Sequence, residues 1–203
     1  MEQGSKAWFA ARLGKVTASR VADLMAKTKT GWGAGRANYM AELISERLTG
    51  VPADNYSSAA MQWGTDTEPQ ARTDYEFLTN RIVNQVGMIE HPTIPMTGAS
   101  PDGLIADDGL IEIKCPNTAT HIGTLLNRRV PEKYITQMQW QMACTGRQWC
   151  DFVSFDPRLP PAMKLWITTI PRDDKRIAEL EQAVIAFLAE LDAKLKALRE
   201  LYQ

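Results

Sequence analysis

The sequence predicts an α/β protein, in which strand-like and helix-like segments alternate along the chain. Two apolar segments, 149–155 and 164–170, have the length and composition of strands. A helix-like pattern precedes them at 131–145 and is closed by Gly146. The last segment, 173–202, has apolar residues at steps of three and four, so we expect a long amphipathic C-terminal helix.

The remaining elements follow from periodicity and from capping residues. The expected further helices are 6–13, 17–25 with Thr17 as N-cap, 37–49, about 67–78 and 118–126, and the expected further strands are 81–89 and 96–99. Pro69 suits the first turn of the fourth helix. A longer helix kinked at this proline also fits the sequence.

Composition limits the class of protein. The chain has 203 residues, 44% of them hydrophobic, and a formal net charge of −1. These values predict a single domain, 1–203, and give no overall basic signature for nucleic acid. No apolar run reaches the roughly 20 residues that span a bilayer, and no signal-peptide core opens the chain. We therefore expect a cytoplasmic protein without membrane contact, whose cysteines (Cys115, Cys144, Cys150) are reduced thiols.

A charged motif stands out in segment 100–114. Glu112 and Lys114 are two residues apart, so on a strand they share one face. A three-residue loop at 107–109, with its glycine left-handed, would pair Asp102 with Lys114 and bring all three charges to that face. A two-residue turn would move Asp102 to the other face. A function that uses all three needs the odd loop, or a bulge at Gly103 with the same effect.

This charged set suits a hard metal ion. The carboxylates of Asp102 and Glu112, with the backbone carbonyl of Ile113, suit Mg²⁺ or Mn²⁺ rather than zinc. Lys114 would then orient or deprotonate a water near the metal, as phosphodiester hydrolysis requires. Two carboxylates also occur in glycosidases, and a surface hairpin with a weak ion pair has the same sequence pattern.

Three other stretches carry polar groups whose roles the residues leave open. Arg12 and Ser19 flank a predicted helix start, which is either an anion site or an ordinary cap. The basic loop 27–36 is either a phosphate track, with an aromatic ring to stack on a base, or a solvated linker. Tyr134, Gln137 and Gln141 fall on one face of a helix, which is either a functional face or its solvent side.

A family resemblance favours the nuclease interpretation. Segments 98–103 and 112–116 closely resemble the signature of the PD-(D/E)xK nucleases and, more narrowly, of the lambda-exonuclease family of phage recombination nucleases. Four further motifs of the family are matched. Trp8 with 12–14 and 17–19 resembles its N-terminal motif, and Trp63–Gly64 with Glu68 its helix-borne glutamate motif. Tyr134 with Gln137 resembles its downstream helix, and 155–158 the end of its late strand. They cover nearly the whole chain in the family's order.

The resemblance implies a restriction-endonuclease-like core, with a central mixed sheet flanked by helices and a long C-terminal helix, in a single nuclease domain. It implies Mg²⁺-dependent, processive 5′-to-3′ degradation of one strand of linear duplex DNA. The metal would be held by Asp102, Glu112 and, directly or through water, Glu68, with Lys114 serving the water. Mn²⁺ would be able to substitute for Mg²⁺. The sequence alone does not decide between one bound ion and two, and we expect two.

The resemblance also assigns residues around the metal. Arg12, Ser19 and Ser100 match residues that grip the terminal 5′-phosphate, and Tyr134 and Gln137 match residues that line the active site. Met61 falls where the family carries a leucine wedge between the last base pairs.

The expected partners and alternatives also follow from this family. It forms ring-shaped homotrimers around DNA and works with a single-strand annealing protein, which implies a phage or prophage origin in a bacterial cell. The alternatives are another PD-(D/E)xK nuclease, such as an endonuclease or resolvase, and a non-catalytic DNA-end-binding recombination protein.

Overall fold

The computed structural model describes residues 2–28, 31–53 and 58–202. The helices are α1 (Lys6–Arg12), a 3₁₀ turn η1 (Ala18–Arg20), α2 (Val21–Met25), α3 (Ala34–Thr49), α4 (Ala59–Thr79), α5 (Thr118–Asn127), α6 (Glu132–Thr145) and α7 (Asp174–Tyr202). The strands are β1 (Val16–Thr17), β2 (Lys27–Thr28), β3 (Gly31–Trp32), β4 (Val83–Asn84), β5 (Ile89–Glu90), β6 (Thr97–Ala99), β7 (Gly103–Ile105), β8 (Gly109–Lys114), β9 (Trp149–Phe155) and β10 (Leu165–Pro171).

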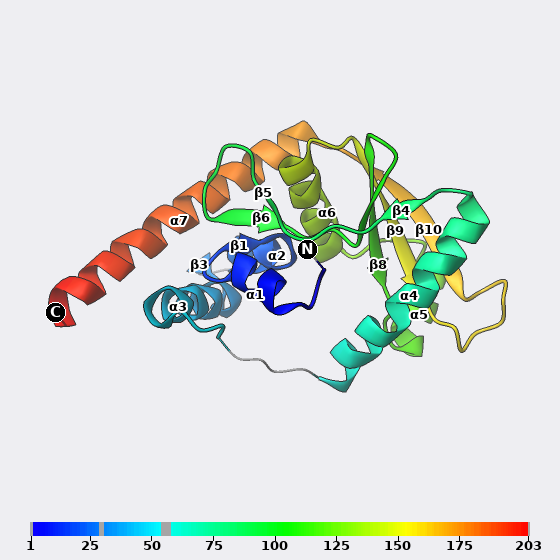
Figure 1. Ribbon diagram of the computed structural model, residues 1–203, viewed down its shortest axis with the longest axis horizontal. Coiled ribbons are helices and arrows are strands. Elements are labelled where there is room, and N and C mark those ends of the chain that lie inside the picture. Colours follow the sequence, from blue (N-terminus) through cyan, green and yellow to red (C-terminus); the bar gives the residue numbers. More distant parts are fainter. Residues whose placement is uncertain (1, 29–30, 54–57, 203) are drawn as a thin grey trace.

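A five-stranded mixed sheet forms the centre, in the order β10-β9-β8-β7-β4, with β8 and β9 parallel and the other neighbours antiparallel. A second sheet has the order β1-β6-β5. The helices α4 and α6 lie on opposite sides of the central strands (Figure 1). The predicted α/β class, mixed sheet and long C-terminal helix are confirmed.

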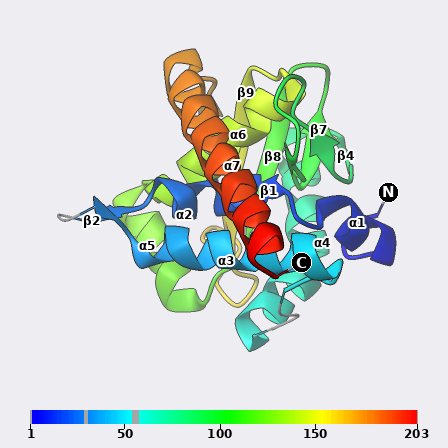
Figure 2. The ribbon, with the colours of Figure 1, turned by 90° about the vertical axis from the view of Figure 1, so that its left-hand side faces the viewer.

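Side chains of the central strands alternate between two apolar clusters. Leu110 and Phe152 face the cluster that includes α2, α3, α6 and α7. Ile111 and Val153 face the cluster that includes α4. Since alternate residues share a face, Glu112 lies on the α6 side of the sheet, in line with Leu110. Figure 2 shows α7 crossing α6 and α3. The buried apolar residues of α7 thereby cover the first cluster.

Most predicted elements are present, and several predictions need correction. The helix expected near Thr67 begins at Ala59, where the Ser58 hydroxyl accepts from Met61 N (3.2 Å), and Pro69 lies inside it, as in the longer helix that the sequence also allowed. The proline is tolerated because Thr65, whose carbonyl loses its donor, is exposed, so water can reach that carbonyl. The expected strand 81–89 is instead two short strands, because the chain leaves β7 after β4 and joins β6 at β5.

The basic loop 27–36 is the third correction. Its described residues form the β2–β3 pair and the first turn of α3, while 29–30 lie outside the described residues. Arg36 is buried, is paired with Glu190 of α7 (2.7 Å) and lies over the Trp32 ring. Its charge is therefore used inside the protein, and it does not belong to a phosphate track.

The loop of the charged hairpin has three residues, as predicted, but lies one residue earlier than predicted. Cα partners are Gly103 with Ile111 and Ile105 with Gly109, so the three loop residues are 106–108. The left-handed residue is Ala106 (φ 46°) instead of Gly109. Gly109 meets a different demand, because a Cβ there would lie 2.1 Å from the Trp149 ring.

Arg147 holds this loop in place. One of its guanidinium nitrogens, Nη1, donates to the carbonyls of Ile105, Ala106 and Gly109, at 3.0, 2.9 and 2.7 Å. The cation thereby compensates for a non-glycine residue in the left-handed region, which costs about 1–2 kcal/mol. No local sequence pattern indicates this contact, since Arg147 lies 38 residues beyond Gly109.

Replacing the strained residue should stabilise the protein. Ala106→Gly is expected to raise the free energy of unfolding by up to about 1 kcal/mol, because glycine adopts positive φ without steric cost. The control is Ala189→Gly on the exposed side of α7, which should lower it by about 0.5–1 kcal/mol. Urea denaturation measures both; a loss of stability in Ala106→Gly as large as in the control would contradict the strain.

Candidate active site

The hairpin places the two carboxylates and the lysine together. Asp102 lies just before β7, one residue beyond the Gly103–Ile111 pair and therefore opposite Glu112. Its Oδ2 accepts from the backbone N of Ile113 at 2.6 Å. Glu112 and Lys114 form an ion pair on the α6 face of β8.

The Glu112 side chain is fully buried, and both of its carboxylate oxygens accept hydrogen bonds. Its Oε1 accepts from Gln137 Nε2 (2.6 Å) and from the Lys114 ammonium. Its Oε2 accepts from Gln141 Nε2, also at 2.6 Å. Both amides come from α6, so the helix face that the sequence left undecided is directed at this carboxylate.

Burial and neighbouring charge alter the acid–base properties of the site. Burial raises the pKa of the Asp102 carboxyl well above its usual value, and the Glu112 and Glu68 carboxylates raise it further. Burial lowers the pKa of Lys114, but Glu112 and Asp102 outweigh this effect, so that pKa lies above the lysine value. The site therefore concentrates negative charge around one ammonium.

Glu68 approaches from α4, on the other side of the sheet. Burial raises the pKa of its carboxyl, although Arg72 next to it acts in the opposite direction. Arg72 forms an ion pair with Glu68 across one helical turn. The sequence analysis did not include Arg72, but its spacing of four residues from Glu68 is the signal that would have found it.

The donor set suits a hard divalent cation. Asp102 and Glu112 supply carboxylate oxygens, the ligands that Mg²⁺ and Mn²⁺ prefer. The raised pKa of Asp102 reflects burial first and the neighbouring acids second, and a bound cation would favour its ionised form. Across the described ranges, no group of three His, Cys, Asp or Glu side chains is arranged to hold a metal, and Glu68 is paired with Arg72.

A separate pocket of about 310 Å³ lies between α1, η1 and α3. Arg12 lines it, with its guanidinium 4.1 Å from the centre of the Trp8 ring and its Nη1 3.4 Å from Ser100 Oγ. Trp8 Nε1 donates to the same hydroxyl at 2.9 Å. Among the described residues no carboxylate pairs with Arg12, and burial lowers its pKa. A half-buried guanidinium without a carboxylate partner among the described residues is suited to bind an anion.

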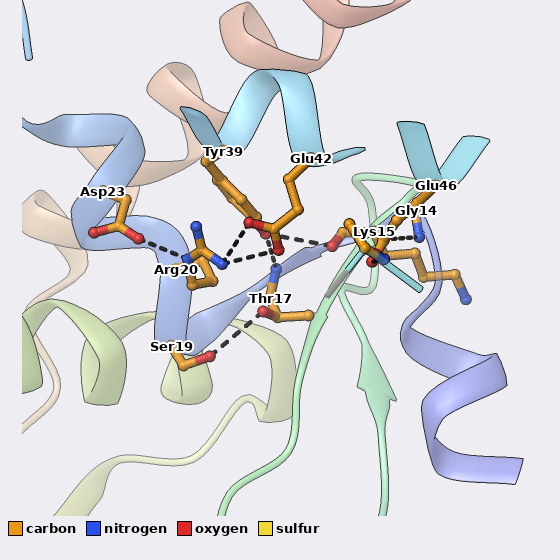
Figure 3. A network of polar contacts seen from close by, with 10 residues as sticks. Gly14, Lys15, Thr17, Ser19, Arg20, Asp23, Tyr39, Glu42 and Glu46 are labelled. Carbon is orange, nitrogen blue, oxygen red and sulfur yellow. Dashed lines mark hydrogen bonds and ion pairs between the residues drawn. The ribbon is translucent and has the colours of Figure 1, made fainter. Parts of the chain in front are cut away.

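The other charges of the pocket are already compensated. Arg20 bonds both oxygens of Glu42 at 2.9 Å and Asp23 at 2.6 Å (Figure 3). Glu46 accepts from the backbone N of Gly14 at 2.7 Å. Lys15 is paired with Glu90. Arg12 is therefore the pocket-lining cation in the described chain without a carboxylate partner.

The remaining predicted residues lie around the same two features. Ser19 lines the pocket, with its hydroxyl 3.5 Å from that of Thr17, but no hydrogen bond joins it to Arg12 or Ser100 in the described structure. Thr17 takes the N-cap position of η1 without a side-chain capping bond. Met61 also lines the pocket and is 59% exposed.

Tyr134 lies beside the catalytic candidates. Its ring stacks on Phe152 and lies 5.2 Å from the Lys114 ammonium. The structure therefore gathers the hairpin acids, the lysine, Tyr134 and Gln137 into one cluster, with Ser100 leading from it to the pocket.

A comparison with known protein families shows which family this chain belongs to. The sequence model of the YqaJ-like viral recombinase domain matches residues 7–148. The chain belongs to the YqaJ-like viral recombinase family. The match includes the hairpin, the pocket and both glutamines of α6 that bind Glu112.

Solved structures place this YqaJ-like chain among exonuclease folds. It is 60% identical to an alkaline exonuclease, LHK-Exo, from Laribacter hongkongensis, with a TM-score of 0.90 and 97% of each chain covered. A structure of LHK-Exo in complex with dAMP gives a TM-score of 0.91 at the same identity and coverage. A phage-related exonuclease from Haemophilus somnus 129PT is 16% identical, with a TM-score of 0.75 over 91% of this chain and 96% of that one, which shows the shared fold.

No curated protein matches the YqaJ-like chain significantly. The described part of the chain has no helix long and apolar enough to cross a membrane. The predicted kinship with phage recombination exonucleases, and the fold that it implied, are confirmed.

Proposed function

We propose that this protein is an exonuclease that degrades one strand of linear duplex DNA from its 5′ end and leaves a 3′ single-stranded overhang for recombination. One observation carries the proposal: two residues before Asp102 of the acid–acid–lysine set, Ser100 contacts Arg12, a pocket-lining guanidinium without a carboxylate partner among the described residues. The family and the 60% identical alkaline exonuclease support the same reaction class. The dAMP bound to that relative belongs to the class of products that such an enzyme releases.

The residues suggest a division of labour. Asp102, Glu112, the Ile113 carbonyl and Glu68 would hold Mg²⁺ or Mn²⁺, as two ions, once Glu68 leaves Arg72. The bound cation supplies charge stabilisation and lowers the pKa of water. Lys114, kept protonated by its acidic neighbours, orients the attacking water as a hydrogen-bond donor. Tyr134 and Gln137 fix the lysine and the Glu112 carboxylate from α6.

The pocket accounts for recognition of the DNA end. Arg12 and Ser100 are already in contact and would bind the terminal 5′-phosphate, with Ser19 as a further donor. A charge-assisted bond to phosphate needs a guanidinium that no carboxylate occupies, which is the state of Arg12. Met61, exposed at the same pocket, would separate the last base pair.

Processivity is proposed on the family resemblance. A ring-shaped homotrimer would enclose the DNA, and a single-strand annealing protein would receive the overhang. The near-neutral net charge of −1 agrees with topological enclosure, since tight phosphate binding would slow sliding. Light scattering of the protein in solution tests the trimer, whose mass would be three times 22.7 kDa.

A substrate comparison tests the reaction. With Mg²⁺, the wild type is expected to release label from the 5′ ends of a linear duplex, to leave a covalently closed circle intact, and to stop when the cation is chelated. Cleavage of the circle would instead support an endonuclease or resolvase. Binding of DNA ends without any nucleotide release would support a non-catalytic recombination protein.

A further inference from the structure

Gln141 is a buried polar residue that the proposed reaction does not use. Its side chain is 0% exposed, which excludes the solvent-side interpretation left open by the sequence. Its Nε2 donates to Glu112 Oε2 at 2.6 Å. The amide could not be turned round without placing its oxygen against a carboxylate oxygen.

Fold stability does not explain an amide at this position. The neighbouring α6 residues Met138, Trp140 and Met142 are fully buried and apolar. Burying an amide is unfavourable unless its polar atoms are hydrogen-bonded. Gln141 Oε1 meets no donor in the described part of the chain. An apolar side chain of similar size would fill the space but would leave the buried Glu112 Oε2 without this donor, so the contact with Glu112 is what distinguishes glutamine here.

The two glutamines of α6 act on different oxygens of the same carboxylate. Gln137 binds Oε1 and Gln141 binds Oε2, each at 2.6 Å and one helical turn apart. A carboxylate held at one oxygen can still turn about the bond to its side chain. A carboxylate held at both oxygens by groups on one rigid helix has a fixed plane.

We propose that Gln141 is a positioning residue, which fixes the plane of the Glu112 carboxylate for binding a divalent cation. The inference rests on the proposed function, in that it takes Glu112 as a metal ligand. Residues that orient a metal ligand through a hydrogen bond typically contribute about 10–100-fold to metal affinity.

Cation binding without DNA tests this role. Gln141→Met keeps the volume and helix propensity of the side chain and removes the amide. Titration calorimetry with MnCl₂ on the full chain is expected to show affinity about 10-fold weaker than in the wild type. The nuclease assay should show a rise in the Mn²⁺ concentration needed for half-maximal rate.

Gln139→Met is the matched control on the same helix. Gln139 is also buried, but its amide donates to Pro171 O (2.8 Å) and accepts from Asp173 N (2.9 Å), away from Glu112. Its loss should lower the melting temperature and leave the Mn²⁺ affinity within about twofold of the wild type. If Gln141→Met does not fold, Gln141→Leu provides the same measurement.

The outcomes separate this inference from the proposed function. Wild-type Mn²⁺ affinity in a folded Gln141 variant, or an equal loss in Gln139→Met, would overturn the positioning role while nuclease activity stands. The third outcome is that the wild type binds Mn²⁺, that Gln141→Met binds it more weakly, and that the wild type hydrolyses no DNA. This result would support the positioning role and overturn the proposed function.

Discussion

Asp102→Asn is expected to abolish nucleotide release and, in the absence of metal, to make the protein more stable. The loss should be on the order of 10³-fold or more, because a neutral amide cannot replace a metal-binding carboxylate. Asparagine is nearly isosteric, and its carbonyl oxygen can still accept from Ile113 N, as Asp102 does at 2.6 Å. The local structure should therefore be retained.

The gain in stability follows from the direction of the pKa shift. Burial and the neighbouring acids raise the pKa of Asp102, so the folded protein binds this proton more tightly than the unfolded chain. That contribution is fully present below the unfolded pKa of about 3.9 and is lost as the pH rises through the folded pKa. At pH 8 the unfolded chain has lost this proton, so retaining the carboxyl in its buried, acidic surroundings lowers the stability of the metal-free fold, and asparagine removes this penalty.

Thermal unfolding at pH 8 with chelator, with and without added Mg²⁺, measures the effect. A gain of about 1 kcal/mol raises the melting temperature of a chain of this size by about 2–4 °C. Added Mg²⁺ should stabilise the wild type much more than the variant. Asp107→Asn, an exposed acid in the hairpin loop, is the control and should change neither property. Full activity in Asp102→Asn would refute the metal mechanism.

Arg12→Gln is expected to remove the preference for 5′-phosphorylated ends. A charge-assisted hydrogen bond contributes about 1.5–3 kcal/mol, which corresponds to about 10–150-fold in rate on phosphorylated ends. The rate on 5′-hydroxyl ends should hardly change, since that end offers no anion. The effect is specific to this guanidinium because, among the described residues, it has no carboxylate partner.

Paired substrates that differ in the terminal phosphate measure the ratio of the two rates. Lys15→Gln is the matched control: it removes a positive charge from the same pocket, but one already paired with Glu90. It should leave the ratio within about twofold of the wild type. Equal losses on both kinds of end in Arg12→Gln would show that Arg12 supports the fold instead of reading the phosphate.

The sequence predicted elements well where the pattern is local. Strand 149–155 was placed at its observed bounds, because a segment rich in aromatic residues and valine, bounded by the polar residues Gln148 and Asp156, is typical of a strand. Pro69 favoured a helix start near Thr67, because proline marks a helix start more often than a helix interior. The longer helix, which the sequence also allowed, is the one present, and the exposure of Thr65 makes the proline acceptable within it.

The site was predicted in its components but not in its connections. The predicted odd number of loop residues placed Asp102 on the face of Glu112, although the loop lies at 106–108 and not at the predicted 107–109. The second amide on Glu112, and the arginine that holds the loop, depend on packing between segments far apart in the chain. No local pattern encodes such contacts.

The burial of Cys115, the residue after Lys114, affects the reactivity of its thiol at the candidate site. Burial raises the pKa of its thiol to about 12, and the carboxylates of Glu68 and Asp102 add to the effect. An ordinary thiol near pKa 8.5 becomes a reactive thiolate under alkaline conditions. This one stays protonated, so oxidants and alkylating reagents have little nucleophile to attack. The candidate site therefore has an unreactive thiol next to Lys114, and Cys115 should resist alkylating reagents even under alkaline conditions.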